Sequence, residues 1–131
     1  MFLLDTDTII YSLKGNPAVR KSLGEHLRDS MGISVVTLME LYYGAYKSRK
    51  IVSNLARIRA IENAFEVMPI SQEAAQTFGE LKTNLEKQGT PLDDFDLILA
   101  ACALSHNCTL VTNNAKHFGR IPGLRLANWA A

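Results

Sequence analysis

The fold is decided by the opening stretch Met1-Phe2-Leu3-Leu4-Asp5-Thr6-Asp7, in which an apolar run stops abruptly at an acid. Phe2 to Leu4 predicts a short buried strand, because an unbroken apolar run is typical of a strand that is covered on both faces. Burying an unpaired carboxylate is costly, so an acid directly after such a strand indicates a specific partner or a function for Asp5.

Alternating strands and helices are predicted along the rest of the chain. Further strands are expected at residues 33–36, 66–68, 109–112 and 124–126, and helices at residues 17–29, 37–47, 54–65, 71–88 and 96–105. This alternation predicts an α/β fold, a three-layer α/β/α arrangement with a central parallel sheet of four or five strands. The chain length fits a single domain, residues 1–131. Right-handed crossovers then place the loops after the strands at one edge, where ligands usually bind.

Composition narrows the class of protein. The chain is 47% hydrophobic and 21% charged, with 14 Lys and Arg against 13 Asp and Glu and a formal net charge of +1. These values exclude a disordered or collagen-like chain, and they require any electrostatic attraction to be local. No signal peptide is evident, and the longest apolar run, residues 97–104, is too short to span a bilayer. With two cysteines, the chain is expected to be cytoplasmic, with no membrane association.

Acidic side chains fall where the strands end. Asp5 follows the first strand, Glu40 follows the second, Asp96 begins an apolar helix, and Asn114 follows the strand at residues 109–112. The carboxyl ends of neighbouring parallel strands converge, so these side chains could share one pocket. Three close carboxylates repel one another, and a divalent cation removes that conflict. Oxygen ligands without His or Cys indicate Mg²⁺ or Mn²⁺, which suits hydrolysis of a phosphodiester by a metal-activated water.

Each acid also has a structural interpretation. Residues 37–40, Thr-Leu-Met-Glu, fit the capping box of a helix, and Asp96 fits a helix N-cap. Asp7 fits either a cap of the following turn or a supporting acid beside Asp5. Residues 93–94 are expected to be solvated in a Pro- and Gly-rich loop.

Basic residues cluster in two segments. Residues 47–59 carry five basic side chains and no acid, and Lys47, Arg49 and Lys50 are the candidates for binding substrate phosphates. A second cluster contains Lys14, Arg20, Lys21 and Arg28. A basic rim around an acidic, metal-filled pocket suits a polyanionic substrate, and an ordinary solvated helix face is the alternative.

A zinc site is the weaker interpretation of Cys102, His106 and Cys108. Their spacing could be drawn as a metal cluster, but no fourth ligand is evident in the sequence. Two buried thiols and a surface imidazole are therefore expected.

Four segments together resemble the PIN-domain nucleases, and more narrowly the VapC-type toxins of type II toxin–antitoxin pairs. These segments are Leu3-Leu4-Asp5-Thr6-Asp7, the run from Ser34 to Gly44 with Thr37 and Glu40-Leu41, Asp96 to Ala101, and Leu110 to Asn114 followed by Phe118 and Pro122-Gly123-Leu124. Any one of them is a weak signal, whereas four in order at fitting separations are a strong one. The resemblance covers nearly the whole chain.

The resemblance implies a Mg²⁺- or Mn²⁺-dependent endoribonuclease that acts on tRNA, rRNA or mRNA. It also implies a homodimer that is held inactive by a cognate antitoxin, whose C-terminal segment enters the active-site groove. The residues that match the family are the metal-binding acids Asp5, Glu40 and Asp96 and the supporting hydroxyl residues Thr6 and Thr112. Asn114 stands at the fourth catalytic position, where the family carries an acid, and the missing charge leaves a second metal less well held.

Two other functions remain open at this point. Residues 2–8 fit the nucleophile motif of haloacid-dehalogenase-type phosphatases, with Asp5 attacking phosphate and Asp7 acting as acid and base. Those domains are usually longer, and no convincing lysine-bearing loop follows. A catalytically inactive RNA-binding domain is the other alternative, with Asn114 as the first sign of decay.

Overall fold

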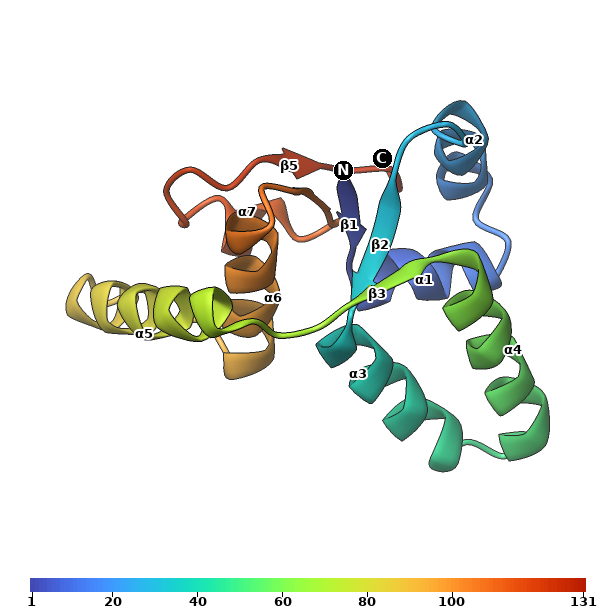
Figure 1. Ribbon diagram of the computed structural model, residues 1–131. Helices are drawn as coiled ribbons and strands as arrows, with labels where there is room; N and C mark the ends of the chain where they lie inside the picture. The colour runs from blue at the N-terminus through green and yellow to red at the C-terminus, as the bar shows by residue number, and fades with distance from the viewer.

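The computed structural model describes residues 1–131 and contains one sheet of five strands, in which every neighbouring pair is parallel (Figure 1). The strands are β1 (Phe2–Leu4), β2 (Met31–Ser34), β3 (Glu66–Met68), β4 (Thr109–Val111) and β5 (Leu126–Ala127). Their spatial order is β3-β2-β1-β4-β5. The predicted parallel sheet is therefore confirmed. From β1 the chain first adds β2 and β3 on one side of the sheet and then β4 and β5 on the other side, so the strand order reverses between β1 and β4.

Seven helices connect the strands. They are α1 (Thr6–Leu13), α2 (Pro17–Glu25), α3 (Val35–Tyr46), α4 (Ile51–Ala64), α5 (Gln72–Lys87), α6 (Asp94–Ser105) and α7 (Ala115–Phe118). Helices α5 and α6 lie on one side of the sheet, and α1, α2 and α4 lie on the other (Figure 1). None of the helices combines the length and the apolar character that crossing a membrane requires.

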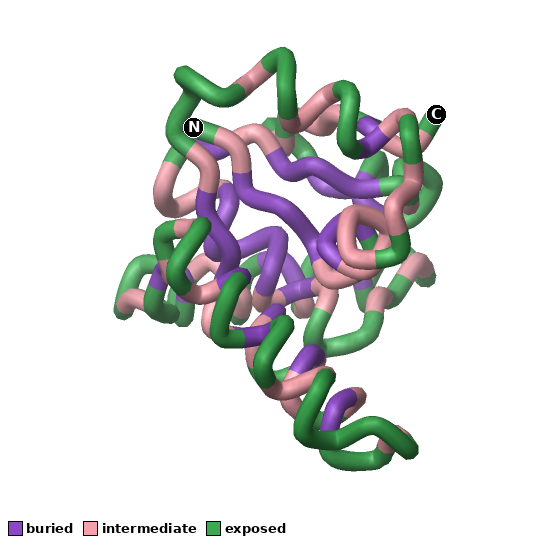
Figure 2. Tube along the Cα trace, turned by 90° about the vertical axis from the view of Figure 1, so that its right-hand side faces the viewer, coloured by how far each residue is buried: buried purple, intermediate pink, exposed green.

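The sheet separates two hydrophobic cores. Leu3 and Leu110 belong to a cluster of 16 buried residues that includes half of α6, whereas Leu4 and Val111 belong to a cluster of 10 residues under α1 and α4. Successive side chains of a strand point to opposite faces, so β1 and β4 each contribute to both cores. Figure 2 shows the buried strands at the centre and the exposed outer sides of the helices. The three-layer prediction is confirmed.

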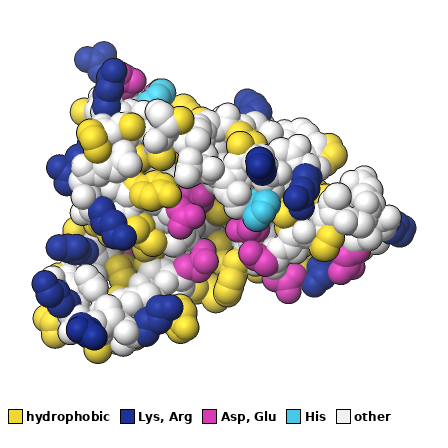
Figure 3. Space-filling model, turned by 180° about the vertical axis from the view of Figure 1, so that it is seen from behind, with side chains coloured by type: hydrophobic (Ala, Val, Ile, Leu, Met, Phe, Trp, Pro, Cys, Tyr) yellow, Lys and Arg dark blue, Asp and Glu magenta, His cyan; other side chains and the backbone are white.

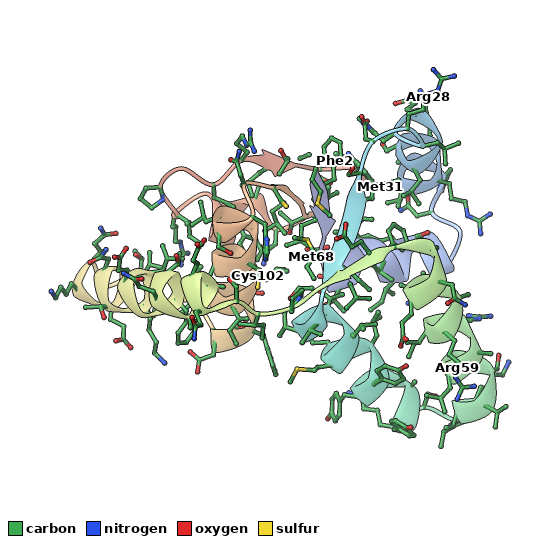
Figure 4. All side chains as sticks on the ribbon, in the orientation of Figure 1. Phe2, Arg28, Met31, Arg59, Met68 and Cys102 are labelled. Atoms are coloured by element: carbon green, nitrogen blue, oxygen red, sulfur yellow. The ribbon has the colours of Figure 1, made fainter.

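The two ends of the sheet have different environments. Phe2 and Met31 pair at the start of β1 and β2, close to both chain termini (Figures 1 and 4). The opposite edge, where the parallel strands end, is free of the termini. It is the edge at which the loops and helix starts that follow β1, β2 and β4 meet.

Three predicted helix starts are wrong. Helix α4 begins at Ile51 rather than at residue 54. Helix α3 begins at Val35, because the Ser34 hydroxyl caps it by accepting the Val36 N–H at 3.2 Å. The Thr-Leu-Met-Glu segment at residues 37–40 is therefore no capping box, and β2 ends two residues earlier than predicted. Helix α6 begins at Asp94, and the N-cap is Asp93, whose carboxylate accepts the Asp96 N–H at 2.9 Å.

Helices α1 and α7 were not predicted, and the predicted end of α2 lies too far along the chain. Helix α1 starts directly after Asp5, which is its N-cap, so Asp7 lies in the first turn and does not cap it. Helix α7 has only four residues, and α2 ends at Glu25 rather than at residue 29. These helices are too short for hydrophobic periodicity to reveal their ends.

The two cysteines belong to the core. Cys102 and Cys108 are free and buried, as expected, and burial raises the pKa of both thiols. Cys102 lies on the side of α6 that faces the sheet, where its Sγ accepts a hydrogen bond from the Ser34 hydroxyl at 3.8 Å (Figure 4). The expectation of a surface imidazole is wrong, because His106 is half-buried and its Nε2 is buried without a partner.

Candidate active site

A small polar pocket of about 90 Å³ lies at the edge where the strands end. Its lining residues are Asp5, Thr6, Asp7, Glu40, Asp96, Leu99, Asn114 and Phe118. The pocket sits beyond the ends of β1 and β4, between which the strand order reverses, and this is where open α/β sheets bind ligands. Acids from three distant parts of the sequence therefore meet, and Figure 3 shows Asp and Glu side chains gathered near the middle of this face.

Asp5 is fixed by the ends of the two central strands. Its backbone N–H donates to the Val111 carbonyl at 3.0 Å, and its Oδ1 accepts the Thr8 N–H at 2.8 Å. Thr8 in turn donates its hydroxyl to the same Val111 carbonyl at 3.3 Å. Asp5 is only 6% exposed. One carboxylate oxygen thus caps α1, while the other has no protein hydrogen-bond donor and is available to a ligand.

Glu40 is oriented by Thr6. The Thr6 hydroxyl donates to Glu40 Oε1 at 2.6 Å, a length typical of a charge-assisted hydrogen bond. This bond joins the first turn of α1 to the second turn of α3. Because the donor comes from the residue after Asp5, the two carboxylates are positioned relative to each other.

The pocket concentrates negative charge. Burial raises the pKa of Asp96 to about 6, with further contributions from the charge and hydrogen bond of Asp93 and from the charges of Glu40 and Asp5. Burial and the Asp5 charge also raise the pKa of Asp7. None of the ion pairs in the structure includes an acid of the pocket. The protein therefore supplies no cation of its own to balance these carboxylates.

The donor set fits a hard divalent cation. The pocket presents carboxylate, hydroxyl and amide oxygens and contains no His or Cys, which favours Mg²⁺ or Mn²⁺ over Zn²⁺. No three acids already have the spacing of a metal cluster. The carboxylates line the pocket without closing on one point.

Asn114 contributes the uncharged side of the pocket. Its backbone N–H donates to the Thr112 hydroxyl at 3.0 Å, so Thr112, which is 1% exposed, shapes the turn after β4. The side-chain nitrogen of Asn114 lies 2.8 Å from Nδ1 of His117. Thr112 therefore acts on the pocket through Asn114 and does not line it.

The predicted phosphate-binding residues lie apart from the pocket. Lys47, Arg49 and Lys50 are exposed in the connection between α3 and α4. Lys47 Nζ lies 4.5 Å from the centre of the Tyr43 ring. Figure 3 shows Lys and Arg side chains around this end of the molecule, beside the acidic centre of the same face.

Three residues near the acids were missed by the sequence analysis. Leu99 and Phe118 line the pocket, and Asp93 adds a charge beside Asp96. The spacing Asp93-x-x-Asp96 before an apolar run was a usable signal, because a cap residue accepts the N–H three residues later. Leu99 and Phe118 lie in or beside the segments that resemble the PIN-domain nucleases, but their apolar character alone does not distinguish them from other core residues.

The chain is similar to known proteins over almost its whole length. The model of the PIN domain family matches residues 2–124. The chain is 38% identical to the tRNA(fMet)-specific endonuclease VapC of Salmonella typhimurium, over 98% of this chain and 97% of the relative. It is 36% identical to ribonuclease VapC2 of Rickettsia felis, over 98% of each chain. Among solved structures, the VapBC2 complex of Rickettsia felis bound to a promoter DNA fragment superposes with a TM-score of 0.92 at 35% identity, over 98% of each chain.

Proposed function

The chain belongs to the PIN domain family, and on that premise we propose that it is the ribonuclease toxin of a toxin–antitoxin pair. The observation that carries the proposal is the convergence of Asp5, Glu40 and Asp96 on one pocket. Its partner is a cognate antitoxin, since the solved relatives from Rickettsia felis and Salmonella typhimurium are VapBC complexes bound to DNA. The expected homodimer remains a prediction.

We propose Mg²⁺ or Mn²⁺ as the cofactor, with Asp5 and Asp96 as direct ligands. A divalent cation in such a pocket lowers the pKa of bound water and stabilises negative charge on a phosphate. Glu40, held by Thr6, either completes the ligand set or orients the attacking water and takes its proton. Asn114 adds an amide instead of a fourth charge, so the site is suited to one resident cation.

The reaction that these groups support is hydrolysis of an RNA phosphodiester. The water oxygen forms the new bond to phosphorus, the bond to the 3′ oxygen breaks, and that oxygen leaves with a proton. The products carry a 5′-phosphate and a 3′-hydroxyl. Substrate phosphates outside the pocket are attracted by the basic residues of the same face, among them Lys47, Arg49 and Lys50.

The other functions are less well supported. The phosphatase interpretation is disfavoured because the family model that matches residues 2–124 is that of the PIN domain. An inactive binding domain has no need of the three acids, and all three line the pocket.

The proposal is tested by incubating the purified protein with end-labelled RNA in Mg²⁺, in Mn²⁺ and in EDTA. Initiator tRNA is the first substrate to try, because the Salmonella typhimurium relative is named a tRNA(fMet)-specific endonuclease. We expect cleavage with either cation, none in EDTA, and none for Asp96→Asn with either cation. Cleavage in EDTA, or a fully active Asp96→Asn protein, would contradict the proposal.

A further inference from the structure

A second hollow adjoins the acidic pocket. It is a groove of about 430 Å³ between α1, α3 and α4. Glu40 lines both the groove and the acidic pocket, so the two are neighbours along one continuous surface. The volume is within the range of small-ligand sites, roughly 300–1,000 Å³, and suits one nucleotide better than a folded partner.

The groove is lined by both apolar and basic side chains. Its apolar lining, here called the floor, includes Ile10, Leu13, Leu41 and Ile58, and its two basic residues are Lys14 and Arg57. Lys14 is the C-cap of α1, and Arg57 lies on α4, so the two cations come from different elements. This combination matches a nucleotide, which has a flat base of low polarity and a charged phosphate.

Both cations are free. Neither Lys14 nor Arg57 takes part in an ion pair or a side-chain hydrogen bond, and both are exposed. The one carboxylate of the groove, Glu40, accepts its hydrogen bond from Thr6. A lysine and an arginine without acidic partners can therefore bind a phosphate without breaking an existing bond.

The side chain of Asn54, which lines the groove, can form a hydrogen bond with a base. Asn54 donates its side-chain N–H to the Ser48 hydroxyl at 2.8 Å, and Ser48 donates to the Ala45 carbonyl at 2.6 Å. These bonds fix the amide of Asn54 and leave its carbonyl oxygen without a partner. That oxygen can accept a hydrogen bond from the exocyclic amine of a base.

We propose that this groove binds the nucleotide next to the scissile phosphate of a single-stranded RNA. The base lies on the apolar floor, and Lys14 and Arg57 hold its phosphate. The inference rests on the proposed ribonuclease function and deepens it. It assigns substrate binding near the reaction to residues other than Lys47, Arg49 and Lys50, which lie outside both hollows.

The test measures RNA affinity in an Asp96→Asn background, so that the substrate stays intact. The variant K14A R57A is compared with K87A R120A, which removes the same charge from exposed positions outside both hollows. We expect K14A R57A to weaken binding of a fluorescent oligoribonucleotide about tenfold. The salt slope should fall by about 0.7, since the two cations hold one phosphate and each phosphate contact on a single strand contributes about 0.7. The control variant should change affinity by less than about twofold.

Shortening the RNA locates the contact. We compare oligonucleotides trimmed one nucleotide at a time from either end. The difference between the parent protein and K14A R57A should disappear when the nucleotide that occupies the groove is removed. Arg57→Lys should retain part of the affinity, because it keeps the charge but loses the planar donor geometry. Thermal unfolding of each variant checks that the fold is intact.

Three outcomes would overturn the inference. An equal loss of RNA affinity in K14A R57A and in K87A R120A would show only a general electrostatic attraction between the protein and RNA. Unchanged RNA affinity together with lost antitoxin binding would assign the groove to the protein partner. A difference that persists at every RNA length would place the contact elsewhere. If the parent protein neither binds nor cleaves RNA, the proposed function itself fails, which is distinct from all three.

Discussion

Asp5 has two separable roles, and substitution by Asn and Ala distinguishes them. Its Oδ1 caps α1 through the Thr8 N–H, and its carboxylate lines the acidic pocket. Asn is as good a cap as Asp, whereas Ala cannot cap at all. Asp5→Asn therefore removes the charge and keeps the cap, and Asp5→Ala removes both.

The expected loss of stability follows from the burial of the cap. Loss of an N-cap costs about 1 kcal/mol on average, and the upper value of about 2 kcal/mol applies here because Thr8 is 2% exposed and its N–H would find no water. For a chain of this size, we expect Asp5→Ala to lower the Tm by roughly 4 to 8 °C. Asp5→Asn should stay within about 2 °C of the parent or exceed it, because the Asp5 charge that raises the pKa of Asp96 and Asp7 is gone.

RNA cleavage by the two variants should depend on the negative charge of residue 5 rather than on the stability of the fold. Removing a direct metal ligand should reduce cleavage at least about a hundredfold, more than is typical of a residue that only supports a ligand. Both variants should therefore be inactive, although only Asp5→Ala is destabilised. The assays are thermal unfolding by circular dichroism in EDTA and single-turnover RNA cleavage in Mg²⁺. An active Asp5→Asn protein, or equal Tm values for the two variants, would refute the reasoning.

Three further substitutions test other contacts. Thr6→Val removes the hydrogen-bond donor to Glu40 and should slow single-turnover cleavage about 10- to 100-fold, while Thr6→Ser should retain activity. Equal cleavage rates for the two variants would exclude a positioning role for Thr6. His26 stacks on the only tryptophan, Trp129, with ring centres 5.0 Å apart. His26→Ala should therefore red-shift the tryptophan fluorescence and lower the free energy of unfolding in urea by about 1 kcal/mol. An unchanged emission spectrum would contradict the stacking. Tyr43 is 67% exposed on α3, on which Met39 and Tyr46 are also exposed. If these side chains form the interface of the expected homodimer, Tyr43→Glu should give a monomer by light scattering, whereas an unchanged mass would place the interface elsewhere.

The layers of the fold could be predicted because burial leaves a direct trace in the sequence. The apolar runs at β1 and α6 and the pattern of α5 gave the strands and helices to within a few residues. The start of α3 could not be placed in the same way. Ser34 and Thr37 are both good caps by residue type, and only the end of β2 selects Ser34.

The site was predicted in its composition but not in its detail. The acids Asp5, Glu40 and Asp96 were expected to converge because parallel strands end at one edge, and they line one pocket. The hydrogen bond from Thr6 to Glu40 and the groove with Arg57 depend on how α1, α3 and α4 pack. Contacts of that kind between distant segments leave no local pattern in the sequence.

The central claim is that acids distant in the sequence hold one divalent cation that is used in RNA hydrolysis. Its most direct test is a crystal structure of the protein grown with Mn²⁺, in which anomalous scattering locates the ion. We predict one strong peak in the acidic pocket, with carboxylate oxygens of Asp5 and Asp96 about 2.2 Å away and Glu40 either bound directly or joined through a water. A Mn²⁺ ion bound only elsewhere, or one that leaves Asp5 and Asp96 uncoordinated, would contradict the claim.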